Sequence, residues 1–231
     1  MIGADIFRAG RGICQIAVAA LLLHGCNTAP RGRVSPPAQQ PNVAVQLAPD
    51  WQRTALLADV ERLGRIDQAW SEALDAAHKR GFRRSVAAEG ELLEPGAALA
   101  RPSPGPGSYM CRLIQIGATA RGARAFAASK PGFCYVGVDD EGRLWLARQT
   151  GPLRREGYLW EDTNVRRMIY LGSLAKGARD AAPSYGTVPE RSRGAVFERI
   201  GPLRYRLVTP WPEGFKLEVM ELTPAPLQSK D

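Results

Sequence analysis

The chain has 231 residues, and its 31 lysines and arginines outnumber 23 aspartates and glutamates to give a formal net charge of +8. That length accommodates one sizeable domain with an additional arm. The basic residues are 26 arginines and 5 lysines, scattered among many alanines, glycines and prolines. This pattern is typical of a GC-rich genome and not of a helix that binds nucleic acid, so we expect no nucleic-acid partner. A generally solvated surface is the simplest interpretation, and a basic surface facing anionic lipid or lipopolysaccharide is the alternative.

Residues 1–25 have the order of a secretory signal peptide. Two arginines precede an apolar run of 11 residues, Ile13–Leu23, which is shorter than the roughly 20 residues that span a bilayer. The sequence Leu23-His24-Gly25-Cys26 then resembles a lipobox, although His24 replaces the small or β-branched residue that is usual there. We therefore expect cleavage after Gly25 and a diacylglycerol on the sulfur of Cys26, the first residue of the mature protein.

Lipidation would decide where the protein resides. Two or three acyl chains hold a protein firmly, because each buried methylene contributes about 0.8 kcal/mol. The residue after Cys26 is Asn27 and not aspartate, which by resemblance to the usual sorting rule favours the outer membrane. We predict a lipid-anchored protein on the periplasmic face of the outer membrane. Ordinary secretion with a free Cys26 is the alternative.

A tether and a helix follow the predicted signal. Residues 26–49 are rich in proline, glutamine, arginine and alanine, which predicts a flexible tether. Residues 50–81 predict an amphipathic helix that Asp50 caps and Gly81 ends. Because this helix would be about 45 Å long, we expect a break near Gly64. Its apolar positions recur every three or four residues: Leu56, Val60, Leu63, Ile66, Trp70, Leu74 and Ala77. This stripe fits packing against the following domain, with partner binding as the alternative.

Residues 82–107 form a connector rich in proline and glycine, after which the helical period disappears. Short runs rich in β-branched and aromatic residues alternate with turn signals such as Lys-Pro-Gly and Gly-Pro. The runs are Tyr109–Ile116, Phe133–Val138, Arg143–Gln149, Leu153–Trp160, Arg167–Leu171, Val196–Ile200, Leu203–Val208 and Lys216–Leu222. We predict a mainly β (α+β) fold, in which the N-terminal helix precedes an antiparallel barrel or sandwich of about eight strands over residues 108–224. Residues 225–231 form a C-terminal tail.

The four cysteines have separate fates. Cys14 leaves with the signal and Cys26 carries lipid, so Cys111 and Cys134 remain in an oxidising compartment, where thiols pair. Their bridge would close a loop of about 24 residues, which is worth roughly 3 kcal/mol in loop-closure entropy. A redox CxxC motif is absent from the sequence, so a structural disulfide is predicted.

The sequence contains no recognisable catalytic constellation. His78, the one histidine outside the predicted signal, falls at the exposed end of a helix and is a poor base for a hydrolytic nucleophile. GxSxG, HExxH, P-loop and GxGxxG patterns are absent. We expect a non-enzymatic binding or structural module without cofactor or metal. The alternative is an interaction protein such as a periplasmic protease inhibitor. A third interpretation is a hydrolase that uses acids in turns: Asp139, Asp140, Glu161 and Asp162.

From Gly107 onward, several short runs follow one another in a recognisable order: Gly107–Arg112, Phe133-Cys134, Arg167–Gly172, Tyr185-Gly186, Arg199–Pro202, Tyr205–Val208, Pro210–Pro212 and Leu217–Pro224. Through these runs, about half of the chain resembles the domain of unknown function 4893 family of proteobacterial envelope proteins. The turn Thr150-Gly151 is similar to the family's T-G-S-Q-R turn, but Pro152 and Leu153 replace its polar pair. If that pair contacts a ligand, this chain has lost the contact. The resemblance implies a domain and carries no activity.

Six residues are candidates for contact with a ligand or partner: Tyr109, Arg112, Trp145, Tyr170, Arg204 and Arg206. Alternation places Tyr205 and Leu207 on one face of the sheet, together with Leu217 and Val219. If these side chains fill a closed core, their role is structural. If they surround a cavity of a few hundred Å³, a small apolar ligand would bind there, with the arginines as partners for an anionic head group. Arginines that alternate out of a core usually face water.

Overall fold

The computed structural model describes residues 49–151, 153–177 and 179–226. The chain divides into two compact units, Met1–Val45 and Gln46–Asp231, and every described residue belongs to the second unit. The predicted signal peptide, Cys26, nearly all of the predicted tether and most of the predicted tail lie outside the described residues.

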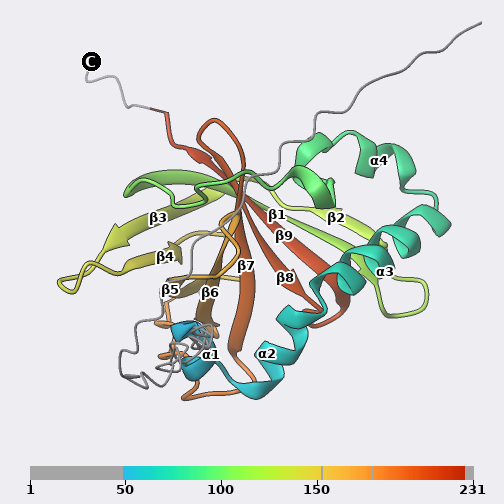
Figure 1. The fold of residues 1–231 in the computed structure, drawn as a ribbon. Coiled ribbons are helices and arrows are strands. Elements are labelled where there is room, and N and C mark those ends of the chain that lie inside the picture. The colour runs from blue at the N-terminus through green and yellow to red at the C-terminus, as the bar shows by residue number, and fades with distance from the viewer. Residues whose placement is uncertain (1–48, 152, 178, 227–231) are drawn as a thin grey trace, which may run out of the picture. The chain divides into compact units, whose positions relative to one another are not determined.

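Eight antiparallel strands of the second unit close into a barrel (Figure 1). β9 pairs back onto β1 along a register that runs from Tyr109 opposite Pro224 to Ala118 opposite Phe215. Closure gives every barrel strand two neighbours and so removes exposed sheet edges. The predicted mainly β fold is confirmed, in its barrel form. The barrel strands are β1 (Gly107–Ala118), β3 (Gly132–Val138), β4 (Leu144–Arg148), β5 (Arg155–Glu161), β6 (Arg167–Leu174), β7 (Ser192–Gly201), β8 (Arg204–Pro210) and β9 (Phe215–Pro224).

Each of the eight predicted runs coincides with one of these barrel strands. A further strand, β2 (Phe126–Ala128), was not predicted. It pairs with residues 114–116 of β1, beyond the part of β1 that pairs with β3. Its three residues are too few to show an alternating pattern, and the pairing depends on the overhanging end of the long β1 strand.

Three helices replace the single predicted one: α1 (Asp50–Thr54), α2 (Leu57–Gly64) and α3 (Ile66–Lys79). The chain breaks after Gly64, as predicted, and also at Ala55 and Leu56, which are extended. At the break between α1 and α2, the Leu56 amide makes a tertiary contact by donating to the hydroxyl of Tyr185 at 3.0 Å. Pro49, and not Asp50, occupies the N-cap position of α1. No helix in the described part of the chain is long and apolar enough to cross a bilayer.

The connector holds three short helical segments, α4 (Arg83–Ala87), η1 (Gly90–Leu93) and η2 (Pro95–Ala97). α3 packs on the outer faces of β1 and β9, and α2 packs on β7. Strands under the helices therefore bury both faces. Buried side chains outside the barrel include Trp70, Ala73, Ile114 and Val208.

A second buried cluster fills the middle of the barrel interior with side chains that include Leu146, Tyr170, Phe197 and Met220. Tyr205 and Leu207 lie in this interior cluster, whereas Leu217 and Val219 lie in the outer one. The prediction that all four share a face is therefore wrong. Burial of both faces of β9 by the helices and the interior removes the polar alternation that would have revealed its orientation.

The predicted disulfide is present. Cys111 of β1 and Cys134 of β3 are bonded, with their Cα atoms 5.8 Å apart. Both cysteines belong to the interior cluster, so the bond ties two neighbouring strands together from inside the barrel.

Candidate functional site

One end of the barrel interior is polar. Inward positions of successive strands place Arg148 of β4 beside Arg155 of β5, and Glu218 of β9 between Thr209 of β8 and Gln115 of β1. Arg148, Arg155, Thr209 and Glu218 are each no more than 3% exposed. At this end, buried charged and polar side chains fill the barrel interior, and apolar side chains do not.

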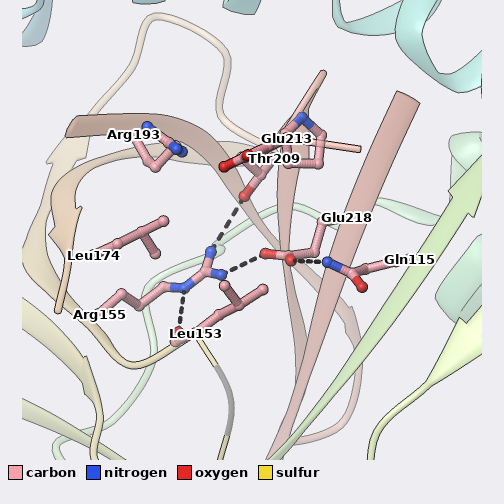
Figure 2. A pocket seen from close by; sticks show the side chains of 9 residues that line it. Gln115, Leu153, Arg155, Leu174, Arg193, Thr209, Glu213 and Glu218 are labelled. Atoms are coloured by element: carbon pink, nitrogen blue, oxygen red, sulfur yellow. Dashed lines mark hydrogen bonds and ion pairs between the residues drawn. The ribbon is translucent and has the colours of Figure 1, made fainter. Parts of the chain in front are cut away.

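Arg155 anchors this layer through a network of hydrogen bonds (Figure 2). Its Nη2 forms an ion pair with Glu218, and Nη1 donates to the hydroxyl of Thr209 at 3.4 Å. The second oxygen of Glu218 accepts from Nε2 of Gln115 at 2.8 Å. Arg155 and Glu218 are therefore satisfied by each other and by their neighbours, as a stable buried ion pair requires.

Arg148 lacks such partners. Its side chain is 1% exposed, yet Nε, Nη1 and Nη2 have no hydrogen-bond partner among the described residues. Burial lowers the pKa of Arg148 to about 10, with a further lowering from the nearby Arg155 and an opposing effect of Glu218. The guanidinium remains charged at neutral pH and is a buried cation without a bound acceptor.

Two glycines let polar groups reach this layer. Gly151 has φ +83, and a Cβ there would lie 2.8 Å from Nη2 of Arg148. A Cβ on Gly172 would lie 2.2 Å from the hydroxyl of Tyr170, so that hydroxyl occupies the space a side chain would take. The Tyr170 hydroxyl has no partner among the described residues, and burial raises its pKa. It therefore stays protonated as a second free donor.

A cavity of about 140 Å³ opens at this end of the barrel. Arg193 of β7 lies across it from Arg155, and Glu213 lies at its edge (Figure 2). Burial, then the neighbouring Arg62 and Arg155, lower the pKa of Arg193. The lining itself balances two arginines against two glutamates, and Arg148, which lies beside Arg155 but outside the lining, adds a third positive charge. The cavity is lined by Gln115, Leu153, Arg155, Leu174, Arg193, Thr209, Pro212, Glu213 and Glu218.

A larger hollow of about 840 Å³ lies at the opposite ends of β5 and β6. It lies between α1, the chain around Pro102 and the strand ends that carry Tyr158 and Met168. Its buried unpaired donor is the indole Nε1 of Trp160. A neutral donor left unpaired costs less than an unpaired cation, so the polar end is the stronger candidate for binding a ligand.

Two of the four turn acids, Asp139 and Asp162, have structural partners. Asp139 accepts from the amides of Glu141 and Arg143 and forms an ion pair with the Arg143 side chain. Although burial opposes it, hydrogen bonds from Arg167 and Trp51 lower the pKa of Asp162. No group of three or more histidine, cysteine or acidic residues within the described ranges is placed to hold a metal ion.

Of the six predicted contact residues, the structure brings only Tyr170 to the polar end. Arg112 and Arg204 share the carboxylate of Glu221 on the outside of the barrel. Arg206 is fully buried, which corrects the expectation that it faces water. Tyr109 donates to the carbonyl of Gly105 at 2.6 Å, and Trp145 lies against Tyr135 on the outer face of β3 and β4.

Four residues of the polar end were not among the predicted contact residues: Arg148, Arg155, Arg193 and Glu218. A signal for Arg148 was available, because it continues the inward alternation of Leu144 and Leu146. Glu218 alternates inward with Met220, but the sequence did not show this orientation because both faces of β9 are buried. Charged residues at inward positions of a strand are unusual, and this irregularity is what marked the site.

Fold and site together define a closed, disulfide-bonded eight-stranded β-barrel with helices over part of its outer face and a charged cavity at one end. The chain belongs to the family described as domain of unknown function (DUF4893), whose model matches residues 51–222. This match includes the helices as well as the barrel. No curated protein and no solved structure matches the chain.

Proposed function

We propose that this protein is a non-enzymatic, lipid-anchored protein of the cell envelope that binds a small oxygen anion at the charged end of its barrel. The observation that carries the proposal is Arg148, a buried guanidinium whose three nitrogens lack partners among the described residues. An isolated buried charge is unfavourable by several kcal/mol. A carboxylate, phosphate or sulfate would offset this cost through charge-assisted hydrogen bonds.

The neighbouring groups support binding in preference to catalysis. Glu218 is engaged by Arg155 and Gln115, and the hydroxyl of Thr209 accepts from Arg155. These groups are fixed by their partners and are not poised to exchange protons. Arg193 and Arg155 line a space about as large as a small anion requires. Arg148 lies beside Arg155 behind this lining, and the Tyr170 hydroxyl lies over Gly172 at the same end of the barrel.

An apolar ligand in the middle of the barrel has less support. Tyr170, Phe197, Leu207 and Met220 are each fully buried there and pack against one another. The envelope location is supported by the lipobox at Leu23–Cys26 and by the Cys111–Cys134 disulfide, because disulfides persist mainly in oxidising compartments.

The test compares anion binding by the full chain and by Arg148→Met, with Arg166→Met as the control at an exposed arginine. Inorganic phosphate, sulfate and acetate are titrated by calorimetry, and the melting temperature is followed at each concentration. We expect at least one anion to bind the native chain and raise its melting temperature, because a ligand of the folded state stabilises it. Arg166→Met should behave in the same way.

Arg148→Met should lose anion binding yet fold at least as stably as the native chain, because it removes a buried charge without orphaning a partner. If no anion binds the native chain, or if Arg148→Met retains native affinity, the proposed site is wrong. An Arg148→Met protein that is less stable than the native chain in the absence of anion would assign this arginine a structural role.

A further inference from the structure

Two segments far apart in sequence place six basic side chains on one side of the second unit. They come from the end of α3, from α4 and from the loop after β1, on the right of Figure 1. The six are Lys79, Arg80, Arg83, Arg84, Arg121 and Arg124, and all are exposed. We call these six residues the basic patch.

Specific contacts hold the two segments together. Nη1 of Arg80 donates to the carbonyls of Ala120 at 3.4 Å and Ala123 at 3.0 Å. The ring of Phe82 stacks on Phe126 with their centroids 6.1 Å apart, and the guanidinium of Arg124 lies 6.0 Å from the centre of the Phe82 ring. The patch is therefore a product of the fold and has partly buried aromatic rings at its centre.

The basic patch differs from the arginines around Glu221 on the outside of the barrel. Arg112 and Arg204 each form an ion pair with a glutamate there. Within the described ranges, none of the six patch residues forms an ion pair. Residues 75–88 and 117–128 contain a single acid, Asp75. An arginine-rich composition explains the number of these residues, but it does not explain why those gathered here lack carboxylate partners.

We propose that the basic patch binds the phosphate-bearing surface of an anionic phospholipid bilayer. The side chains are spread over an exposed surface, which suits a surface of many anionic head groups better than one compact ligand. Each basic residue near such a bilayer strengthens binding by roughly fivefold at low ionic strength. The inference rests on the proposed function in one respect. The lipid anchor at Cys26 would hold the domain beside a membrane and so raise the effective concentration of the basic patch at the membrane surface.

The test uses the full chain with Cys26→Ser, so that an acyl chain does not contribute. Its sedimentation with vesicles of equal parts phosphatidylglycerol and phosphatidylcholine is compared with sedimentation with pure phosphatidylcholine vesicles. The patch variant combines Arg83→Glu, Arg84→Glu, Arg121→Glu and Arg124→Glu. The control variant reverses four exposed basic residues elsewhere, Arg101, Lys130, Arg166 and Lys176, each to Glu, and so changes the net charge equally. Circular dichroism and melting temperature verify that both variants are folded.

We expect selective binding of the Cys26→Ser chain to the anionic vesicles, which weakens as salt is added. The patch variant should lose at least about a hundredfold in partition coefficient, and the control variant only a few-fold. Equal losses in the two variants would show a general effect of net charge and would overturn the proposal. Equal binding to the two kinds of vesicle would also overturn it.

The vesicle experiment tests the basic patch independently of the anion site. Arg148→Met lies inside the barrel and should leave vesicle binding unchanged, whereas the patch variant should leave calorimetric anion binding unchanged. Failure of the patch variant to affect vesicles would therefore leave the anion site standing, and the reverse also holds.

Discussion

Arg206 and Arg148 show that burial of the same side chain has opposite consequences at two places in this barrel. Neither is more than 1% exposed. Arg206 forms an ion pair with Glu198, donates to four backbone carbonyls between Glu91 and Pro95, and lies 4.9 Å from the ring centre of Trp70. Arg148 has no such acceptors among the described residues. The first arginine fastens the connector to the barrel, and the second is available to a ligand.

Replacing Arg206 should therefore be costly. Arg206→Met leaves Glu198 and the four carbonyls without their donor, and we expect a loss of about 3–5 kcal/mol in the free energy of unfolding. Arg204→Met, on the same strand but 30% exposed, should cost less than about 1 kcal/mol. Urea unfolding of both variants measures the difference. Equal stabilities would show that the buried network around Arg206 is not the connector's main attachment.

At the scale of elements, a carboxylate on α3 ties the helix to the strand pair below it. Glu72 accepts from Nζ of Lys216 at 2.8 Å, from Gln68 at 2.8 Å and from the indole of Trp211 at 3.4 Å. These hydrogen bonds, with that of Lys216 the most important, lower the pKa of Glu72 from 4.5 to about 2. The ionised form is thus favoured by folding.

A pH dependence of stability follows from that shift. Because the pKa is lower in the folded chain, the contribution of Glu72 is fully present above its unfolded pKa of 4.5 and is lost as the pH falls toward about 2. Glu72→Gln should melt at a lower temperature than the native chain at pH 7, and the difference should shrink toward pH 2. Glu61→Gln, an exposed control on α2, should match the native chain at pH 7. A Glu72→Gln deficit that is constant with pH would contradict this assignment.

At the scale of the whole molecule, the barrel and the expected membrane anchor lie in different parts of the chain. The family match at residues 51–222 covers all but the last two residues of the barrel, and the predicted lipobox precedes this match. Mass spectrometry of the protein isolated from the envelope should find a diacylglycerol on Cys26 and an N-terminus at that residue. Cys26→Ser should appear in the soluble periplasmic fraction. An N-terminal peptide that begins elsewhere, or an unmodified Cys26, would show ordinary secretion.

The sequence by itself determined the mainly β class, the eight barrel strands and the disulfide. Alternation and turn residues are properties of short segments, and the disulfide followed from which cysteines remain after the predicted processing. Neither inference needs knowledge of what packs where. It could not determine that the strands close, because closure depends on β9 reaching β1 across the whole domain. Nor could it orient β9, since helices bury its outer face and the barrel buries its inner one.

The site belonged to the part that only the tertiary structure decided. Arg148, Arg155 and Glu218 come from three strands, and their chemistry arises from burial and from which of them finds a partner. A sequence records that an arginine is present, but its environment is set by residues as far away in the chain as Glu91 is from Arg206, which is 115 positions. Burial and ion pairing depend on neighbours in space. They give Arg206 a structural role and leave Arg148 without a partner among the described residues.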